Sequence, residues 1–393
     1  MSEANEMDTK ADAKFDIAGI AAVRRAALAQ KVAEAGLDAY YCRNTSDIRW
    51  LTGFDSVFDS ESAHLALVRA GDVVVHTDSR YSEAMESHAA RGDLEVSNER
   101  ETHAKFAAHR LAGCSGSAGA GKLRIGIDPA IALGEFRKLA QAFEDASIDF
   151  ELVEGDADPV RELRKVKDAS EIALMRRAQQ ITDAAFAELL GWIAPGMTEK
   201  EVANELEYSM RKLGATGLAF ATIAASGPHS SMPHAVPSDK LLQKGEFLVL
   251  DFGARYLDYC ADMTRTIAIG EPSAEMVKVY DAVLEAQTRA KAAIKHDLAN
   301  KSVHQIADDT IAEAGYAGKF THSLGHGVGI DIHEDPNLSS KSPDVLAPGN
   351  VVTVEPGIYI PGFCGVRTED YGVVTPTGFD TFTISSHELQ VVE

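Results

Sequence analysis

An acidic residue directly after a short apolar run is the feature of this sequence that most restricts how the chain can fold. Residues 247–250 (FLVL) are followed by Asp251, and after a turn-prone segment the chain resumes at residues 259–262, which end in Asp262. This pattern predicts two strands joined by a hairpin-like connection, with one aspartate on each strand. A carboxylate in that position is costly to bury unless a positive charge meets it. The two acids are therefore either solvated edge residues or the two sides of a cation site.

The same pattern recurs near the C-terminus. Residues 351–354 (VVTV) form an apolar run that ends at Glu355, and residues 366–371 carry Arg367 and Glu369 two positions apart, hence on one face of a strand. Each acid alone could be a surface residue at the end of a strand. Four acids at the ends of apolar strands make that interpretation weak for the whole set.

Histidines gather in the same part of the chain, close to glycines. The glycines at 325, 327 and 329 disfavour a helix and predict an irregular or extended segment there. A single histidine is usually structural, but several near the acids favour a site. The histidines in question are His229, His234, His322, His326 and His333.

The charges of this set are those of a metal site. Asp251, Asp262, Glu355 and Glu369 would carry four negative charges if they converge, and two divalent cations would balance them. Carboxylates with one imidazole suit manganese, iron, cobalt or zinc. Two such ions roughly 3.5–4 Å apart can generate a hydroxide nucleophile near neutral pH.

Composition limits the classes of partner. The chain has 393 residues, which predicts two domains, and a formal net charge of −22, which argues against a nucleic-acid partner. Its four cysteines are widely separated and have no metal-site spacing, so we expect free thiols in a reducing compartment. The polar N-terminus lacks the features of a secretory signal, and no apolar run approaches the ~18 residues that span a bilayer. We therefore expect a cytoplasmic protein without a membrane partner.

Strands and helices alternate in the first third of the chain, which predicts an α/β domain over residues 17–155, preceded by a loose acidic tail at residues 1–16. Residues 112–122 are rich in glycine and serine, but lack the order of a phosphate-binding loop and are interpreted as a surface loop. After a linker, residues 160–393 form the second domain. Apolar periodicity predicts one long helix over residues 160–190, and Thr198 with Glu201 forms a capping box that begins another.

Taken together, these motifs resemble the pita-bread metallopeptidases, in the branch of aminopeptidase P and prolidase. The resemblance is strong over about the last 235 residues and weaker over the first 155. The matching stretches are PGMTEKEVANELE at 195–207, SGPHSSMPH at 226–234, LDFGARYLDYCADMTRT at 250–266, HSLGHGVGIDIHE at 322–334, TVEPGIY at 353–359, GVRTEDYGVV at 365–374 and, more weakly, RWLTGF and TDSRY at 77–81. It implies an α/β (α+β) protein, with a creatinase-like N-terminal domain followed by a pita-bread catalytic domain.

The resemblance also implies roles for individual residues. Two divalent ions, with Mn²⁺ preferred over Co²⁺, Zn²⁺ or Fe²⁺, would be held by Asp251, Asp262, His326, Glu355 and Glu369, with Asp251 and Glu369 bridging both. His234 and His333 would bind the scissile carbonyl, and His322 would bind substrate or relay protons. Glu355 would also accept and donate the proton, and Arg367 would support the cluster.

The implied reaction is hydrolysis of the bond between an N-terminal residue and a following proline. We expect an Xaa-Pro aminopeptidase, with an Xaa-Pro dipeptidase (prolidase) as the alternative, and a homodimer. A metal-free creatinase-like hydrolase and a non-catalytic binding homologue are weaker alternatives because the ligand set is complete. His229 stands where many members have asparagine, and Ala261 where many have serine, which leaves subsite details open.

Overall fold

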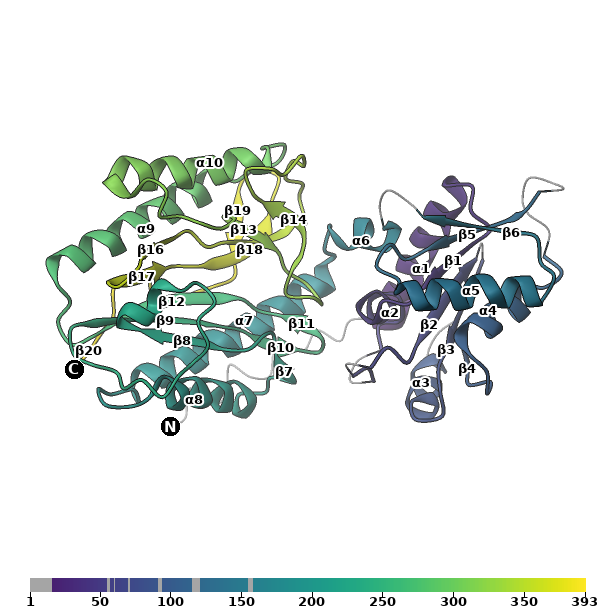
Figure 1. The fold of residues 1–393 in the computed structure, drawn as a ribbon, viewed down its shortest axis with the longest axis horizontal. Coiled ribbons are helices and arrows are strands. Elements are labelled where there is room, and N and C mark those ends of the chain that lie inside the picture. The colour runs from purple at the N-terminus through teal and green to yellow at the C-terminus, as the bar shows by residue number, and fades with distance from the viewer. Residues whose placement is uncertain are drawn as a thin grey trace. The chain divides into compact units, whose positions relative to one another are not determined.

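The chain forms two compact units, Met1–Leu163 and Arg164–Glu393 (Figure 1). The computed structural model describes residues 16–54, 57–59, 61–69, 71–90, 94–114, 121–154 and 158–393. The predicted acidic tail up to residue 15, the centre of the glycine-rich segment and residues 155–157 of the predicted linker lie outside the described residues.

A six-stranded sheet organises the first unit. Strand β2 runs antiparallel to its two neighbours, and the other adjacent pairs are parallel. The sheet order is β4-β3-β2-β1-β5-β6, and the strands are β1 (Ala39–Cys42), β2 (Leu65–Arg69), β3 (Asp72–His76), β4 (Glu95–Ser97), β5 (Leu123–Ile127) and β6 (Phe150–Glu154). Strands β2 and β3 form an antiparallel hairpin.

Helices cover this sheet. The core consists of apolar side chains of α4 and α5 packed against β1, β2, β3 and β5, among them Phe106 and Phe143. The helices are α1 (Ile17–Glu34), α2 (Thr45–Thr52), α3 (Ser82–Ala89), α4 (His103–Leu111) and α5 (Leu133–Asp145). The predicted alternation of strands and helices is confirmed.

The long helix predicted over residues 160–190 is wrong. Two helices occupy this range, α6 (Pro159–Arg164) and α7 (Ala169–Leu190). Between them the Lys167 amide donates to the Gly349 carbonyl at 2.9 Å, a bond that a continuous helix would not allow. Asp168 then begins α7 with a capping box that Glu171 completes. Apolar periodicity continues through this break and hides it.

The predicted capping box of Thr198 and Glu201 is confirmed, and it begins α8 (Glu199–Lys212). The aspartate hairpin is confirmed in part. Strand β9 (Glu246–Phe252) pairs with β12 (Met263–Ile269), whereas the predicted second strand is the short β11 (Tyr259–Cys260), which pairs with β10 (Ala254–Tyr256). Asp262 lies between β11 and β12.

Two larger sheets form the centre of the second unit, with order β20-β12-β9-β8 in one and β14-β13-β15-β18-β19 in the other. A two-stranded sheet, β16-β17, contacts helix α9 (Ala274–Ala293) and strands β9 and β12. The remaining strands are β7 (Gly217–Leu218), β8 (Ile223–Ser226), β13 (Gly325–Gly327), β14 (Glu334–Leu338), β15 (Val351–Val354), β16 (Gly357–Ile360), β17 (Cys364–Arg367), β18 (Asp370–Val374), β19 (Phe379–Thr381) and β20 (Val391–Val392).

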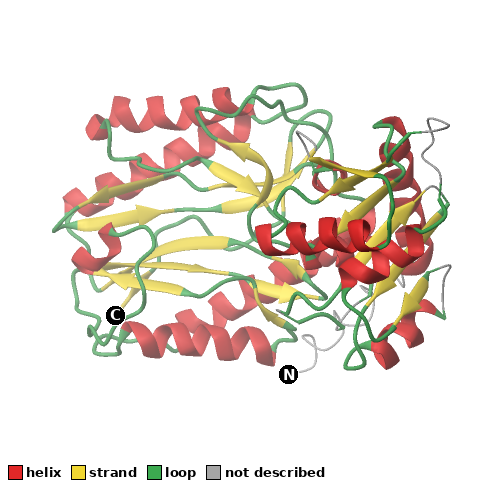
Figure 2. Cartoon of the chain, turned by 45° about the vertical axis from the view of Figure 1, so that its right-hand side comes forward, coloured by secondary structure: helices red, strands yellow, loops and turns green. Residues whose placement is uncertain are grey.

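Two pairs of helices enclose these sheets, with α7 and α8 on one side and α9 (Ala274–Ala293) and α10 (Asn300–Ile311) on the other (Figures 1 and 2). Each pair buries its apolar face in a separate core. The predicted α+β class is therefore confirmed. No helix in the described part of the chain has both the length and the apolar character needed to cross a bilayer. All four cysteines are free, and three are buried.

Candidate metal centre

Five predicted ligands come from the facing sheets of the second unit. Asp251 lies near the end of β9, Asp262 directly before β12 and Glu355 directly after β15. His326 lies within β13, so the extended conformation predicted for this glycine-rich segment is confirmed. Glu369 occupies the junction between β17 and β18. Strand ends from both sheets therefore supply the cluster.

The distances bring these side chains together. His326 Nε2 lies 3.3 Å from Glu355 Oε1 and 3.6 Å from Asp262 Oδ2. Asp262, His326 and Glu369 each offer an atom within 4.8 Å of the other two. Asp251 is linked to this group through Arg367, which donates to Asp251 and to Thr264, the threonine that bonds Glu369.

The acids of the cluster destabilise one another's charges. Burial raises the pKa of Asp262 and of Glu369 well above the usual range, and the neighbouring carboxylates add to the effect. Burial raises the pKa of Glu355 to about 8, although the nearby Arg367 opposes the shift. A positive charge added at this point would favour the ionised carboxylates and so oppose all three shifts.

Two observations fit a bound cation. Asp251 Oδ1 and Glu369 Oε1 are buried and have no hydrogen-bond partner among the described residues, although a carboxylate oxygen in that position normally has one. The second observation concerns His326, whose Nδ1–H donates to the Gly327 carbonyl at 3.0 Å, so that its Nε2 lone pair faces the acids. Burial lowers the pKa of His326 to about 4, which keeps the ring in the neutral form that binds metals. Oxygen ligands with one imidazole suit a divalent transition metal.

Threonines orient the ligands. Thr264 Oγ1 donates to Glu369 Oε2 at 2.8 Å, and Thr353 Oγ1 donates to Glu355 Oε1 at 3.2 Å. The His326 amide in turn donates to Thr353 Oγ1 at 3.0 Å. A side chain at position 325 would place its Cβ 2.1 Å from the Thr353 carbonyl oxygen, so glycine is required there.

Arg367 contacts Asp251, whereas the resemblance implied a general role beside the cluster. Its Nη2 donates to Asp251 Oδ2 at 2.6 Å, its Nε donates to Thr264 Oγ1 at 3.1 Å, and its Nη1 donates to the Tyr359 hydroxyl at 2.8 Å. One guanidinium therefore orients a predicted bridging ligand and the threonine that bonds Glu369.

Tyr359 is a site residue to which the sequence analysis gave no role. Its hydroxyl accepts from Arg367 and donates to His322 Nε2 at 2.9 Å, because His322 Nδ1–H is used by the Ser323 carbonyl at 2.8 Å. Burial lowers the pKa of His322 to about 4. Tyr359 lies in a quoted motif, but only the fold brings it to His322. Both ring nitrogens of His322 are thus engaged within the protein.

The other predicted histidines divide into two groups. The ring of His333 lies 4.4 Å from that of His326, and Arg367 Nη1 donates to the carbonyl of Pro233, next to His234, at 3.2 Å. His333 therefore borders the cluster, and the backbone directly before His234 contacts Arg367. His229 does not border the cluster, because its Nδ1 bonds Glu199 at 2.8 Å.

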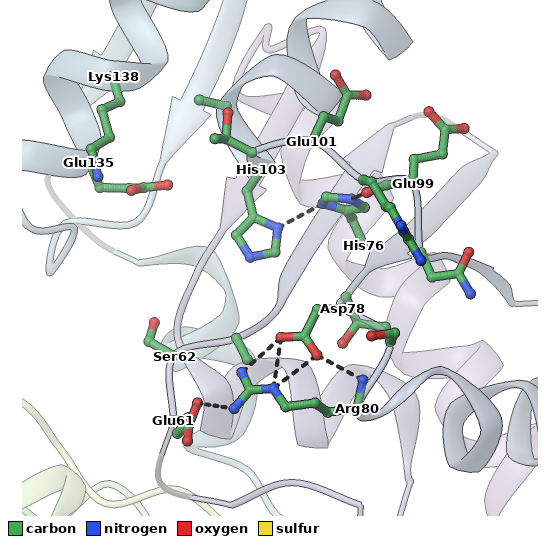
Figure 3. Close-up of a pocket in the computed structure, with 17 residues that line it drawn as sticks. Glu61, Ser62, His76, Asp78, Arg80, Glu99, Glu101, His103, Glu135 and Lys138 are labelled. Carbon is green, nitrogen blue, oxygen red and sulfur yellow. Dashed lines mark hydrogen bonds and ion pairs between the residues drawn. The ribbon is translucent and has the colours of Figure 1, made fainter.

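A pocket of about 960 Å³ in the first unit contains none of the predicted site residues (Figure 3). Several of its polar groups pair with one another. His103 Nδ1 lies 2.7 Å from His76 Nδ1, and Arg80 forms ion pairs with Asp78 at 2.8 Å and with Glu61 at 2.7 Å. Because buried acids and a histidine gather in the second unit, the chemistry of the chain is assigned to that cluster.

Comparisons with known proteins agree with this assignment. Residues 173–376 match metallopeptidase family M24, and residues 24–166 match the creatinase/prolidase N-terminal domain. The chain is 38% identical over 366 residues to an uncharacterized peptidase of Bacillus subtilis, covering 91% of this chain and 97% of that protein. It is 40% identical over 268 residues to an Xaa-Pro dipeptidase of Pyrococcus horikoshii, covering 67% of this chain and 74% of that protein.

Solved structures are similar over nearly the whole chain. The structure of an Xaa-Pro dipeptidase from Bacillus anthracis is 39% identical, with a TM-score of 0.84, and the match covers 94% of this chain and 99% of that one. That of an X-Pro aminopeptidase from Thermotoga maritima is 36% identical, with a TM-score of 0.80 and coverage of 91% and 98%. The chain therefore belongs to metallopeptidase family M24, in the prolidase and aminopeptidase P branch that its motifs predicted.

Proposed function

We propose that this metallopeptidase hydrolyses the bond between an N-terminal residue and proline, and that Xaa-Pro dipeptides are its preferred substrates. The convergence of four acids and one neutral histidine supports the reaction class. The substrate preference is supported by relatives named as Xaa-Pro dipeptidases, including those of two Pyrococcus species at 40% and 44% identity. The comparisons thus favour the alternative over the aminopeptidase that the sequence analysis put first.

The five ligands of the proposal are Asp251, Asp262, His326, Glu355 and Glu369, and the proposed ions are two divalent cations, Mn²⁺ before Co²⁺, Zn²⁺ or Fe²⁺. Bound cations would polarise the scissile carbonyl and supply a water acidic enough to ionise near neutral pH. The unpartnered oxygens of Asp251 and Glu369 support their assignment as the bridging ligands.

The chain's own residues would handle the protons and the developing charge. Glu355 would accept a proton from the attacking water and pass it to the departing proline nitrogen. His234 and His333 would donate hydrogen bonds to the carbonyl oxygen as it becomes an oxyanion. We assign His322 an indirect role in substrate binding, through Tyr359 and Arg367, because its ring nitrogens are both engaged.

An Xaa-Pro aminopeptidase acting on longer peptides is the second candidate. The likeness to the X-Pro aminopeptidase of Thermotoga maritima favours it. The two candidates share the same cluster chemistry and differ in whether the proline carboxylate must be free.

A direct assay separates them. The Mn²⁺-loaded protein is given one Xaa-Pro dipeptide, the matching Xaa-Pro tripeptide and, as a control, the Xaa-Ala dipeptide. We expect the Xaa-Pro dipeptide to have the highest kcat/KM. Faster cleavage of the tripeptide would establish the aminopeptidase instead, and cleavage of neither proline peptide would refute the proposed function. Glu355→Gln, assayed in parallel, should be inactive on both.

We also propose a homodimer. Sedimentation equilibrium tests this directly, and the expected mass is twice that of one chain. The mass of a single chain would contradict it.

A further inference from the structure

One buried carboxylate outside the cluster binds both ends of the segment that carries His234. Glu199, the first residue of α8, is fully buried. Its Oε1 accepts from the Ser226 amide at 2.7 Å and from the Ser226 hydroxyl at 2.9 Å. Its Oε2 accepts from the Ser238 amide at 3.0 Å, the Ser238 hydroxyl at 2.7 Å and His229 Nδ1 at 2.8 Å. Residues 226–238 are thus tied to a single side chain.

This carboxylate is ionised because its hydrogen bonds outweigh its burial. Burial raises the pKa of Glu199, but the hydrogen bonds donated by Ser238 and Ser226 lower it by more. The net shift of the pKa is therefore downward. Lys240 is nearby, but its Nζ donates to Ser226 Oγ at 2.9 Å and to Glu246 at 2.5 Å. The charge is therefore held by oriented donors of the segment itself, so segment and carboxylate depend on each other.

The middle of the same segment adjoins the cluster. Arg367, which bonds Asp251, also donates to the Pro233 carbonyl at 3.2 Å, and the Gly365 amide donates to Ser230 Oγ at 2.7 Å. His234 follows Pro233 directly. Glu199 therefore fixes the two ends of a segment whose centre contacts the arginine of the site.

We infer that Glu199 is a positioning residue for His234. By holding Ser226, His229 and Ser238 on one carboxylate, it sets the path of residues 226–238 and with it the direction of the His234 ring. This inference rests on the proposed function, in which His234 donates to the developing oxyanion. The asparagine that resemblance leads us to expect at position 229 is replaced here by an imidazole that serves as the fifth donor.

Glutamine at position 199 tests this role with almost no change in volume. Its amide nitrogen must replace either Oε1, where it would face the Ser226 amide, or Oε2, where it would face the Ser238 amide and His229. A serine hydroxyl can turn to accept a hydrogen bond, but a backbone amide cannot. Either orientation leaves a buried donor facing a donor, and the segment must shift.

The matched control is Glu201→Gln. Glu201 lies in the same first turn of α8 and caps the helix through Thr198, but its side chain does not contact the segment in any hydrogen bond of the structure's described residues. We expect Glu199→Gln to lower kcat/KM for the Xaa-Pro dipeptide by about 10- to 100-fold, as for a misplacement of about 1 Å. Glu201→Gln should stay within about twofold of wild type. Equal effects in the two variants would overturn the inference.

A double-mutant cycle separates positioning from general damage. In a His234→Ala background, Glu199→Gln should change kcat/KM by less than about twofold, because the ring that it positions is already gone. The same loss in both backgrounds would show that Glu199 acts independently of His234. Metal content, measured by elemental analysis, should be unchanged in Glu199→Gln, since the cluster ligands are untouched.

A measurement that does not depend on enzymatic activity tests the role of Glu199 even if the proposed function is wrong. Hydrogen–deuterium exchange within residues 226–238 should be faster in Glu199→Gln than in Glu201→Gln, even if wild type cleaves no Xaa-Pro peptide. Unchanged exchange would overturn the inference. If Glu199→Gln does not fold, His229→Ala takes its place. Loss of activity in His229→Ala with recovery in His229→Asn, which keeps a donor, supports the inference, and full activity in His229→Ala contradicts it.

Discussion

Glu369 and Asp370 are consecutive residues, and both are buried, yet their surroundings act on them in opposite directions. Burial raises the pKa of Glu369, and the neighbouring acids Asp262, Glu355 and Asp251 raise it further. Burial also opposes the charge of Asp370, but His387, Arg265 and Lys291 outweigh it and lower the pKa well below the usual range. The contacts are 2.9 Å from Arg265 Nη2 and 2.7 Å from His387 Nε2, with Lys291 also in contact. The difference therefore lies in the partners and not in burial.

This contrast separates structural acids from acids prepared for an added cation. Glu334, beside His333, belongs with Asp370, because Lys167 at 3.0 Å and Arg164 both contact it. Despite burial, these two cations lower the pKa of Glu334 to about 2. In the cluster, the one cation in contact with an acid among the described residues is Arg367, which contacts Asp251. The chain thus supplies its own counterions where a carboxylate only holds the fold, and leaves a deficit of positive charge where the proposed metals bind.

Removing an acid from the cluster that lacks positive charge should have the largest effect on catalysis. We expect Glu369→Ala to lower kcat/KM by on the order of 10⁴-fold. The two proposed cations, which would polarise the substrate, would lose a ligand that they share. Asp262→Ala should behave in the same way. The measurement is turnover of the Xaa-Pro dipeptide with excess Mn²⁺, together with metal content. Full activity in either variant would contradict the ligand assignment.

Stability without metal should respond with opposite signs at the two neighbouring positions. Asp370→Asn leaves Arg265 and Lys291 without their carboxylate and should cost about 3–5 kcal/mol. Glu369→Gln removes one of four mutually repelling acids and should raise the stability of the metal-free protein. Chemical denaturation of both metal-free variants beside wild type provides the comparison. Shifts of the same sign would remove the distinction between the two regions.

Sequence alone identified the acids but could not sort them. Asp251, Asp262, Glu355 and Glu369 stand out because each follows or precedes a short apolar strand, a local signal. Asp370 lies equally close to such a strand, and its counterions Arg265 and Lys291 are 105 and 79 residues away along the chain. Which acid receives a counterion depends on tertiary contacts that no local pattern reports. The same holds for Tyr359 and Thr264, which reach the site only through the fold, and for Glu199, which reaches the segment of His234 in the same way.

The fold shows the same limit. Short strands and capped helices were predictable where turn residues or a capping box marked their ends, as at Thr198. The break between α6 and α7 was missed because apolar periodicity continues across it, although Asp168 and Glu171 carry a capping signal. For the five-stranded sheet of the second unit, the sequence indicated only separate strands with acids at their ends. Its order, β14-β13-β15-β18-β19, depends on pairings between distant segments.

The acids with counterions should also determine the acid stability of the protein. The folded pKa of Glu334 is about 2, below its ordinary value of 4.5, so its ionised form stabilises the fold above about pH 4.5. This contribution, roughly 3 kcal/mol, is lost as pH falls from about 4.5 towards 2. Wild type should therefore lose more stability than Glu334→Gln between pH 6 and pH 3, as measured by denaturant unfolding. Equal losses would show that the two cations do not hold the Glu334 charge.

Adding metal should also distinguish the variants at Glu369 from those at Asp370. Cations that bind only the folded cluster stabilise it by mass action, by about 2.7 kcal/mol at a free concentration 100 times Kd. We therefore expect Mn²⁺ to raise the Tm of wild type. It should raise that of Asp370→Asn by a similar increment from a lower starting point, because Asp370 is not a ligand. Glu369→Gln, which starts higher, should gain much less. The three proteins should thus differ both in the Tm without metal and in the rise of Tm when metal is added. The two quantities together distinguish the surroundings of Asp370 from the cluster that contains Glu369. An equal increment in Glu369→Gln and wild type would place the bound ions elsewhere, and no increment with Mn²⁺, Co²⁺, Zn²⁺ or Fe²⁺ would mean that the deficit of positive charge in the cluster is not a metal site.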